Sequence, residues 1–446
     1  MNITEAKKYV QEHKIKYILA QFVDIHGVAK TKVVPSAHLD MIVNPGAGFA
    51  GFAVWGYGMG PHGPDLMGKG DLSTLTAIGW MPGFARIACD GYVNDKPYEY
   101  DSRVVCGNAL KNFEKETGYQ LYSGLEPEFF LLKQDPVTKA LAPAFDIDVL
   151  EKPCYDYQGF IAVSDFIAEM VQCLIDCGLD VYQIDHEDAN GQFEINFQYT
   201  DALRMADHYI LFKMAATSLA KKHGLLCSFM PKPFSDRTGN GMHMHVSVGN
   251  EKEGNVFEDA SDANGLGLSK LAYQFLGGIL KHSRALAAIT NPSVNSYKRL
   301  VVGGAASGAT WAPAFISYGD NNRTATVRVP YGHLEIRSCD SSANPYLATA
   351  AVVAAGLDGI KNDIDPGKPL NINMYDTTEE ERAKLGVECL PQSLTEAIQC
   401  LEADEVVLAA LGPNLAKEFI GLKKQEWTDY HRHVSDWEVE RYLQFF

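Results

Sequence analysis

Residues 242–248 alternate apolar and polar side chains with a period of two. The apolar positions are Met242, Met244, Val246 and Val248, and the polar positions are His243, His245 and Ser247. Successive side chains of a β-strand point to opposite faces, so this pattern predicts a strand with one face in the core. A lone histidine on the other face is usually a satisfied core group. Two histidines and a serine in one row favour ligand binding.

A second strand-like run, residues 124–132, carries two acids on one face. Glu126 and Glu128 are two positions apart in the sequence GLEPEFFLL, so the same period places both carboxylates on the same side. Taken alone, the pair also fits a solvated strand face.

Residues 184–197 predict a β-hairpin around Asn190-Gly191, because this dipeptide is a preferred two-residue turn. Counting outward from that turn places Glu187 opposite Glu194. Like charges directly across an antiparallel pair are destabilising, so two carboxylates there indicate a cation between them. A surface hairpin is the alternative.

A fifth acid lies among arginines. Glu335 and Arg337 share one face of a short strand-like segment, and Arg299, Arg323 and Arg328 precede it. Guanidinium groups suit phosphate and carboxylate, so the cluster favours anion binding. Surface salt bridges remain an alternative for each arginine alone.

Together the patterns supply five glutamates and one histidine. This oxygen-rich set suits Mg²⁺ or Mn²⁺ better than structural zinc. Two such ions beside several arginines would hold nucleotide phosphates during phosphoryl transfer. The set comprises Glu126, Glu128, Glu187, Glu194, His243 and Glu335.

The composition sets wider limits. The chain has 446 residues, 46% hydrophobic and 21% charged, with a net charge of −17, which fits a folded globular protein and disfavours nucleic-acid binding. The nine cysteines form no CxxC pair, so we expect reduced thiols and a cytoplasmic location. We find no signal peptide, and the longest apolar run, residues 347–357, is too short to span a membrane.

The chain length predicts two or three domains. A helix at residues 3–13 and strands at 17–23 and 28–34 form a small N-terminal unit, which we expect to span residues 1–101. Residues 44–70 are so rich in glycine and proline that we expect an irregular loop bordering a site. Residues 102–446 read as a larger α+β domain, with helices at 166–177 and 201–222.

In this order and spacing, the motifs resemble those of the glutamine synthetase superfamily along nearly the whole chain. They are GLEPEF at 124–129, the hairpin at 187–194, MPKP at 230–233, GMHMHVS at 241–247, NSYKRL at 295–300, EIR at 335–337 with Asp340, and ANPYL at 343–347. The resemblance implies a β-grasp N-terminal domain and a catalytic domain with a curved antiparallel sheet. It also implies a homo-oligomer, a dodecamer of two hexameric rings with active sites between neighbouring subunits.

The resemblance further implies the reaction and the site residues. The family makes γ-glutamyl phosphate from glutamate and ATP, and an amine then displaces phosphate. Two or three Mg²⁺ or Mn²⁺ ions are expected per site, one held by Glu128, Glu187 and Glu194 and another by Glu126, His243 and Glu335. ATP would contact Tyr199, His245, Ser247, Arg323 and Arg328. Glutamate would contact Gly239, Arg299 and Arg337.

The chain departs from the ammonium-using pattern at the amine site. Ala50 and Ala53, with Phe52 between them, stand where an acid and a serine are usual, and Trp311 replaces a second acid. Methyl groups and aromatic rings favour an alkylammonium, and one methyl group is worth about 10–200-fold in selectivity. The pattern is similar to the branch that makes γ-glutamylmethylamide from glutamate, methylamine and ATP. We expect catalytic roles for Glu187, Arg323 and Trp311.

Three alternatives stay open. The enzyme could use ammonia, with the two loops misaligned, or it could use another small amine. It could also be a catalytically silent member of the superfamily, although all six metal ligands are present.

Overall fold

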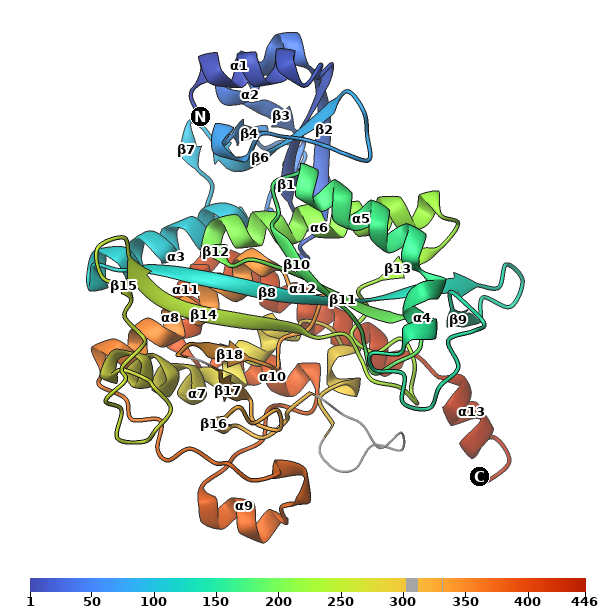
Figure 1. Cartoon of the computed structure of the whole chain (residues 1–446), viewed down its shortest axis with the longest axis vertical. Helices are drawn as coiled ribbons and strands as arrows, with labels where there is room; N and C mark the ends of the chain where they lie inside the picture. The colour runs from blue at the N-terminus through green and yellow to red at the C-terminus, as the bar shows by residue number, and fades with distance from the viewer. Residues whose placement is uncertain (302–311, 331) are drawn as a thin grey trace.

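The computed structural model describes residues 1–301, 312–330 and 332–446. It has a small N-terminal unit, drawn in blue at the top of Figure 1, and a larger part that contains a long curved sheet and most of the helices. The α+β class predicted from the sequence is confirmed.

The N-terminal unit is a mixed sheet covered by a helix. The sheet has the order β2-β1-β6-β4-β3, and β1 runs parallel to β6. The elements are α1 (Ile3–Glu12), β1 (Tyr17–Val23), β2 (Ala29–Pro35), α2 (Leu39–Val43), β3 (Ala47–Phe49), β4 (Leu66–Gly70), β5 (Thr76–Ala77), β6 (Phe84–Val93) and β7 (Lys96–Pro97). Asn2 caps α1 in a capping box with Glu5, which explains why the helix begins where the sequence predicts it.

The expectation that residues 44–70 form no regular element is wrong at both ends. Ala47 pairs with Gly68 and Phe49 with Leu66, so β3 and β4 lie inside this segment. A side chain at position 68 would press against Phe49 and Cys89, and glycine lets the strands approach. An irregular stretch with one short 3₁₀ turn remains between the two strands.

The larger sheet has the order β10-β11-β8-β14-β18-β17-β16, and β8 is its longest strand. Neighbouring strands along this path are antiparallel except for β16 and β17. The strands are β8 (Gln120–Gln134), β9 (Leu141–Pro143), β10 (Val181–His186), β11 (Gln192–Phe197), β12 (Thr200–Asp201), β13 (Leu226–Ser228), β14 (Met242–Asn250), β15 (Gly254–Asn255), β16 (Tyr318–Asp320), β17 (Val327–Val329) and β18 (Leu334–Ile336).

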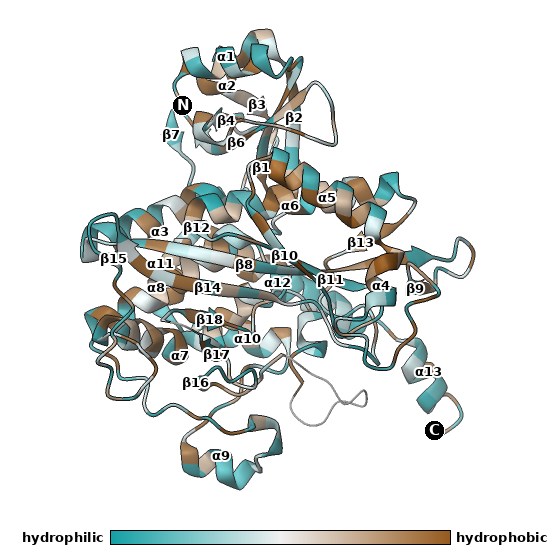
Figure 2. Cartoon of the chain, viewed as in Figure 1, coloured by the Kyte–Doolittle hydropathy of each residue, from teal (hydrophilic) through white to brown (hydrophobic). Residues whose placement is uncertain are grey.

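Helices pack around this sheet, and α8 is almost entirely buried. Figure 2 shows that α1 and α13, at the periphery, are largely hydrophilic. The α-helices are α3 (Ser102–Thr117), α4 (Tyr157–Ala162), α5 (Ser164–Asp176), α6 (Ala202–Lys222), α7 (Lys270–Thr290), α8 (Pro345–Lys361), α9 (Glu379–Leu385), α10 (Leu394–Glu402), α11 (Glu405–Leu411), α12 (Pro413–Arg432) and α13 (Asp436–Tyr442). The 3₁₀ turns are η1 (Ser36–His38), η2 (Gly51–Ala53), η3 (Leu72–Thr74), η4 (Ser296–Lys298) and η5 (Met374–Asp376). The helices expected at 166–177 and 201–222 correspond to α5 and α6.

Two predictions from composition can be compared with the described chain. All nine cysteines lie within its described ranges, and each is a free thiol, so the prediction of no disulfide framework is confirmed. Among the helices that the structure describes, none is long and apolar enough to cross a membrane.

One buried histidine joins three helices. His282 on α7 lies 3.0 Å from Asp358 on α8 and 2.6 Å from Asp404, the residue that caps α11. Burial would lower the pKa of His282, but its hydrogen bonds to both carboxylates raise it above the ordinary value. The imidazolium form is therefore the form that stabilises this junction.

We expect His282→Gln to lower the free energy of unfolding by about 2–3 kcal/mol at pH 6 and by less at pH 9. Because the native pKa is raised, this stability is fully present below the unfolded pKa of about 6.5 and is lost as the pH rises through the native pKa. Thermal unfolding of both proteins at the two pH values measures it, with exposed His62→Gln as control. An equal loss at both pH values would contradict the charged junction.

Candidate active site

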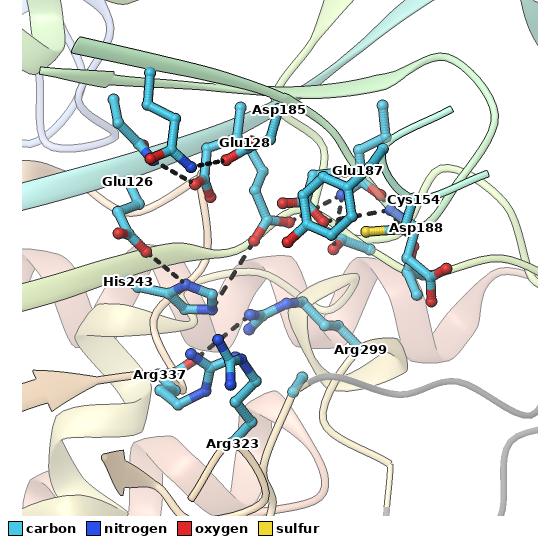
Figure 3. A pocket seen from close by; sticks show the side chains of 18 of the residues that line it. Glu126, Glu128, Cys154, Asp185, Glu187, Asp188, His243, Arg299, Arg323 and Arg337 are labelled. Atoms are coloured by element: carbon cyan, nitrogen blue, oxygen red, sulfur yellow. Dashed lines mark hydrogen bonds and ion pairs between the residues drawn. The ribbon is translucent and has the colours of Figure 1, made fainter. Parts of the chain in front are cut away.

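A cavity of about 380 Å³ is lined by residues of β8, β10, β11, β14 and β17 of the large sheet. In Figure 3 the acidic side chains line one wall, three arginines line the facing wall, and His243 lies between them. The sequence-predicted residues that line the cavity are Glu126, Glu128, Glu187, Glu194, Gly239, His243, Arg299, Arg323, Arg328 and Arg337. Residues from six separated segments therefore meet at one place.

The strand register brings the first acids and the histidine together. Glu126 on β8 lies directly opposite His243 on β14. His243 Nδ1 is 3.2 Å from Glu126 Oε2 and 3.7 Å from Glu335 Oε1, and its Nε2 is 3.9 Å from Glu128 Oε1. The predicted two faces of this strand are confirmed, because Met242, Met244, Val246 and Val248 are at most 1% exposed.

The predicted hairpin register is wrong by two residues. Asp185, not Glu187, lies opposite Glu194, and the loop closes through a hydrogen bond of 2.9 Å from Glu187 N–H to Gln192 O. The cause is the buried Asp148, whose carboxylate accepts hydrogen bonds from the Asn190 side chain and the Gly191 N–H. These two hydrogen bonds to Asp148 hold the loop in a form wider than a two-residue turn. Glu187 still reaches the cavity from that loop.

The acids on this wall repel one another. Burial first, and then the charge of Glu128, raises the pKa of Glu187 to about 8. Burial and the charges of Glu126 and Glu187 raise the pKa of Glu194 well above its ordinary value. The alternative of a surface hairpin is therefore excluded for Glu194, which is 6% exposed. A buried set of mutually repelling carboxylates is stabilised by cations.

Glu126 and Glu335 behave differently because they have cationic neighbours. Burial would raise the pKa of Glu126, yet His245 and His243 hold it well below the ordinary value. Burial also opposes ionisation of Glu335, and Arg337 with His245 lowers its pKa. Glu335 therefore lies in the structure as a carboxylate.

The arginines divide into two kinds. Arg299 and Arg337 are 4% and 5% exposed, so surface salt bridges do not describe them. Arg299 donates to Ser338 O at 2.8 Å, while Arg337 bonds Glu335, which also accepts from Arg328 at 2.6 Å. Arg323 is exposed at the cavity edge. The arginines give this wall a surplus of positive charge that suits anionic substrates.

A second cavity of about 350 Å³ adjoins the first, and both are lined by Glu126 and Tyr182. It contains three of the residues expected to bind ATP, Tyr199, His245 and Ser247. His245 lies between Glu126 and His333. Its Nε2 is 3.0 Å from Glu126 Oε1, and its Nδ1 is 2.8 Å from His333 Nε2. Tyr199 is 64% exposed, which leaves its ring free to stack on a base.

Three of the predicted amine-pocket residues, Ala50, Phe52 and Ala53, do not line the cavity of the chain as described. Ala50, Phe52 and Ala53 lie at η2 on the N-terminal unit, and Phe52 is 53% exposed. They lie between β3 and β4 of the N-terminal sheet, outside the sheet that carries the cavity. Trp311 lies outside the described residues.

The sequence reasoning missed several residues that line the cavity. Tyr155 has a left-handed backbone (φ 63°), and the interaction with Cys154 first, then burial, and then Asp185 and Glu187 raise its pKa. Gln192 donates to Glu128 at 2.9 Å. The other missed residues are Cys154, Tyr182, Gln183, Asp185, Asp188, Asn196, Lys232 and Ala312. Lys232 lies in the MPKP motif, which was a usable signal, whereas Cys154 and Tyr155 carried none.

The donor groups fit hard divalent ions. Ligand atoms of Glu126, Glu194 and His243 lie within 4.8 Å of one another, as do those of Glu126, His245 and Glu335. Carboxylates with an imidazole and no thiolate suit Mg²⁺ or Mn²⁺. These two groups differ from the predicted sets, since both contain Glu126 and one contains His245.

Comparison with known proteins identifies the family. The model of the glutamine synthetase catalytic domain matches residues 99–442. The chain belongs to the glutamine synthetase family. It is 55% identical to the glutamate–methylamine ligase of Methyloversatilis universalis over 447 residues, covering 100% of both chains, and 42% identical to the glutamine synthetase of Rhizobium leguminosarum bv. phaseoli over 98% of both.

The solved structures agree with this assignment. The chain superposes on a GmaS/ADP complex with a TM-score of 0.92 and 41% identity, covering 99% of this chain and 100% of that one. Apo GmaS gives a TM-score of 0.90 at 40% identity, with the same coverage. The predicted superfamily and its fold with a curved sheet are confirmed.

Proposed function

We propose that this chain is an ATP-dependent carbon–nitrogen ligase that joins methylamine to the γ-carboxylate of glutamate. The products are γ-glutamylmethylamide, ADP and phosphate, with γ-glutamyl phosphate as intermediate. The observation that carries the proposal is the 55% identity over the whole chain to a protein named glutamate–methylamine ligase, against 42% to a glutamine synthetase. The replacement of an acid and a serine by Ala50 and Ala53, and of a second acid by Trp311, supports the same substrate.

The acidic wall is the proposed metal site. Glu128, Glu187 and Glu194 would hold one divalent ion, and Glu126, His243 and Glu335 another. Divalent ions bound here neutralise charge on the ATP phosphates. A third ion per site and the choice between Mg²⁺ and Mn²⁺ belong to the same proposal.

The facing wall is the proposed substrate site. Arg299, Arg337 and the backbone at Gly239 would orient glutamate so that its γ-carboxylate meets ATP. Arg323 and Arg328 would stabilise charge on the transferred phosphoryl group. Phosphorylation converts the γ-carboxylate oxygen into a good leaving group, so the amine can displace it. Tyr199, His245 and Ser247 would contact the nucleotide.

The amine has to lose a proton before it attacks. We expect Glu187, the carboxylate beside Tyr155, to accept this proton; its pKa of about 8 belongs to the metal-free site, and a bound cation lowers it. The rings of Tyr155 and Tyr182 offer faces for a methylammonium. We further propose that Ala50, Phe52 and Ala53 come from a neighbouring subunit in a ring, as in a dodecamer, because one chain leaves them on its surface.

An amine panel tests the proposal. With glutamate and Mg·ATP, we expect ADP release with methylamine to exceed that with ammonium by about tenfold or more at equal concentration. Faster release with ammonium would overturn methylamine specificity but leave a glutamine synthetase. Absence of ADP release with methylamine, ammonium and ethylamine would overturn the ligase.

Metal binding should release protons. Since the pKa of Glu187 is raised to about 8 and that of Glu194 is raised well above its ordinary value, a bound cation has to displace protons from this wall. Apparent Mn²⁺ affinity should therefore rise from pH 6 to pH 9, with about one proton or more released per site at pH 7. Calorimetry in two buffers of different ionisation enthalpy measures the release. Glu187→Gln should reduce the number of protons released, whereas exposed Glu251→Gln should leave it unchanged. Zero release at pH 7 would contradict the displacement of protons from these acids.

A further inference from the structure

A third cavity, of about 390 Å³, lies between the N-terminal unit and the helices. It is bounded by the β1–β2 turn, α6, the segment after β13, the region where α8 begins, and α12. Its walls are largely apolar, and the apolar residues are Ile25, Val28, Phe229, Met230, Ile289, Leu347 and Phe419. A cavity of this size and lining suits a small organic molecule.

Lys213 on α6 lines this cavity without a carboxylate partner. Its Nζ donates to Ser341 O at 3.3 Å and lies 5.1 Å from the centre of the Phe229 ring. In the part of the chain that the structure describes, no ion pair joins Lys213 to an acid within 4 Å. Burial lowers the pKa of Lys213 to about 8, and more distant Asp340 and Asp24 offset only part of that effect. A buried ammonium in this position is stabilised by an anion.

The other charged groups of the lining do not supply that anion. Lys423 is 4% exposed and pairs with Glu426 at 2.9 Å. Burial and the charge of Lys423 lower the pKa of His26, so this side chain is neutral near pH 7. Lys30 and Asp24, close to His26, pair with each other at 3.0 Å. The lining therefore carries one net positive charge, which matches a monoanion.

We propose that this cavity binds the anion of a small aliphatic carboxylic acid. The carboxylate meets the Lys213 ammonium, and the hydrocarbon part packs against Phe229, Ile289, Leu347 and Phe419. A phosphate dianion fits less well, because it lacks an apolar part and would meet Glu426 as well as the single unpaired ammonium.

The backbone beside Lys213 also builds the active site. Ser341, whose carbonyl accepts from Lys213, donates its Oγ proton toward the carbonyls of Glu128 at 2.8 Å and Gly241 at 2.6 Å. On the other wall, Met230 O accepts from Asn240 Nδ2 at 3.0 Å, next to Gly239. A ligand in this cavity therefore contacts the backbone that positions Gly239, where glutamate would bind, and it should change the KM for glutamate. This kinetic consequence rests on the proposed function, whereas binding itself does not.

Calorimetry of hexanoate binding to the full-length protein tests the proposal, with Lys213→Met as the variant and exposed Lys221→Met, on the same helix, as control. We expect Lys213→Met to weaken hexanoate binding about tenfold or more, and Lys221→Met to leave it unchanged. Hexanol, which lacks the charge, should bind the wild type more weakly than hexanoate. Val28→Trp, at a position 51% exposed on the rim, should also weaken hexanoate binding while keeping Lys213.

Hexanoate binding that survives both Lys213→Met and Val28→Trp would place the carboxylate elsewhere, such as in the glutamate site, and overturn the proposal. Absence of hexanoate binding to the wild type, or tighter Lys213-dependent binding of inorganic phosphate, would also overturn it. If methylamine ligation is established, saturating hexanoate should shift the glutamate KM at least about twofold in the wild type but not in Lys213→Met. Binding without that shift would overturn the coupling. A chain that binds hexanoate but ligates no amine would refute only the proposed function.

Discussion

Glu126→Gln should lower kcat/KM for amine ligation by about 1,000-fold or more. Glu126 is the acid shared by both groups that could hold a metal ion, and it lies 3.2 Å from His243 and 3.0 Å from His245. Its side chain also lines both adjoining cavities. Removing its charge weakens the metal site and takes the carboxylate away from both neighbouring histidines, and each bound cation is worth several kcal/mol of transition-state stabilisation.

The measurement is ADP release over a range of Mg²⁺ and Mn²⁺ concentrations. Glu251→Gln removes an exposed glutamate just beyond β14 and should retain full activity. The loss should be only partly restored by high metal concentration, because the geometry of both groups depends on the same carboxylate. A Glu126→Gln enzyme that kept more than about a tenth of its activity with an unchanged metal dependence would refute the shared role.

The parts of the site that could be predicted are those set by local periodicity. Glu126, Glu128, His243 and His245 lie on strands whose alternation of two fixes the face of every side chain. Because β8 and β14 pair directly, two correct strand predictions are enough to bring these residues together. Glu335 on β18 joins this group through the same alternation, since it lies opposite His245 on β14.

The parts that could not be predicted depend on distant contacts. The width of the Glu187 loop is set by Asp148, which lies far along the chain from Gly191 and gives no sign of this role in the sequence. The sequence equally does not distinguish buried Arg299 from exposed Arg323, because burial is a property of the assembled fold. The unpaired state of Lys213 is hidden for the same reason. Each of these features follows from tertiary packing and not from a pattern.

The double substitution Ala50→Asp with Ala53→Ser should raise the ratio of kcat/KM for ammonium to that for methylamine by about 10–200-fold. A carboxylate and a hydroxyl replace methyl groups, so the pocket would solvate a small cation better and lose its apolar contact with the methyl group. Amine competition measured as ADP release and product mass gives the ratio. Val137→Asp adds the same charge at a position 86% exposed in the β8–β9 turn and should leave the ratio unchanged. An unaltered ratio in the double variant would show that Ala50 and Ala53 do not line the amine pocket.

The same variant can show which chain supplies the amine pocket. Chains with Ala50→Asp and Ala53→Ser keep an intact metal site, whereas Glu126→Gln chains keep the original residues at η2. Co-assembled oligomers of the two should regain methylamine selectivity if η2 of one subunit completes the site of its neighbour. The gain should grow with the proportion of Glu126→Gln chains, because more of the intact metal sites then face an unaltered η2. Ammonium selectivity that persists at every mixing ratio would mean that each chain completes its own site, through a movement of its N-terminal unit relative to the arrangement in Figure 1.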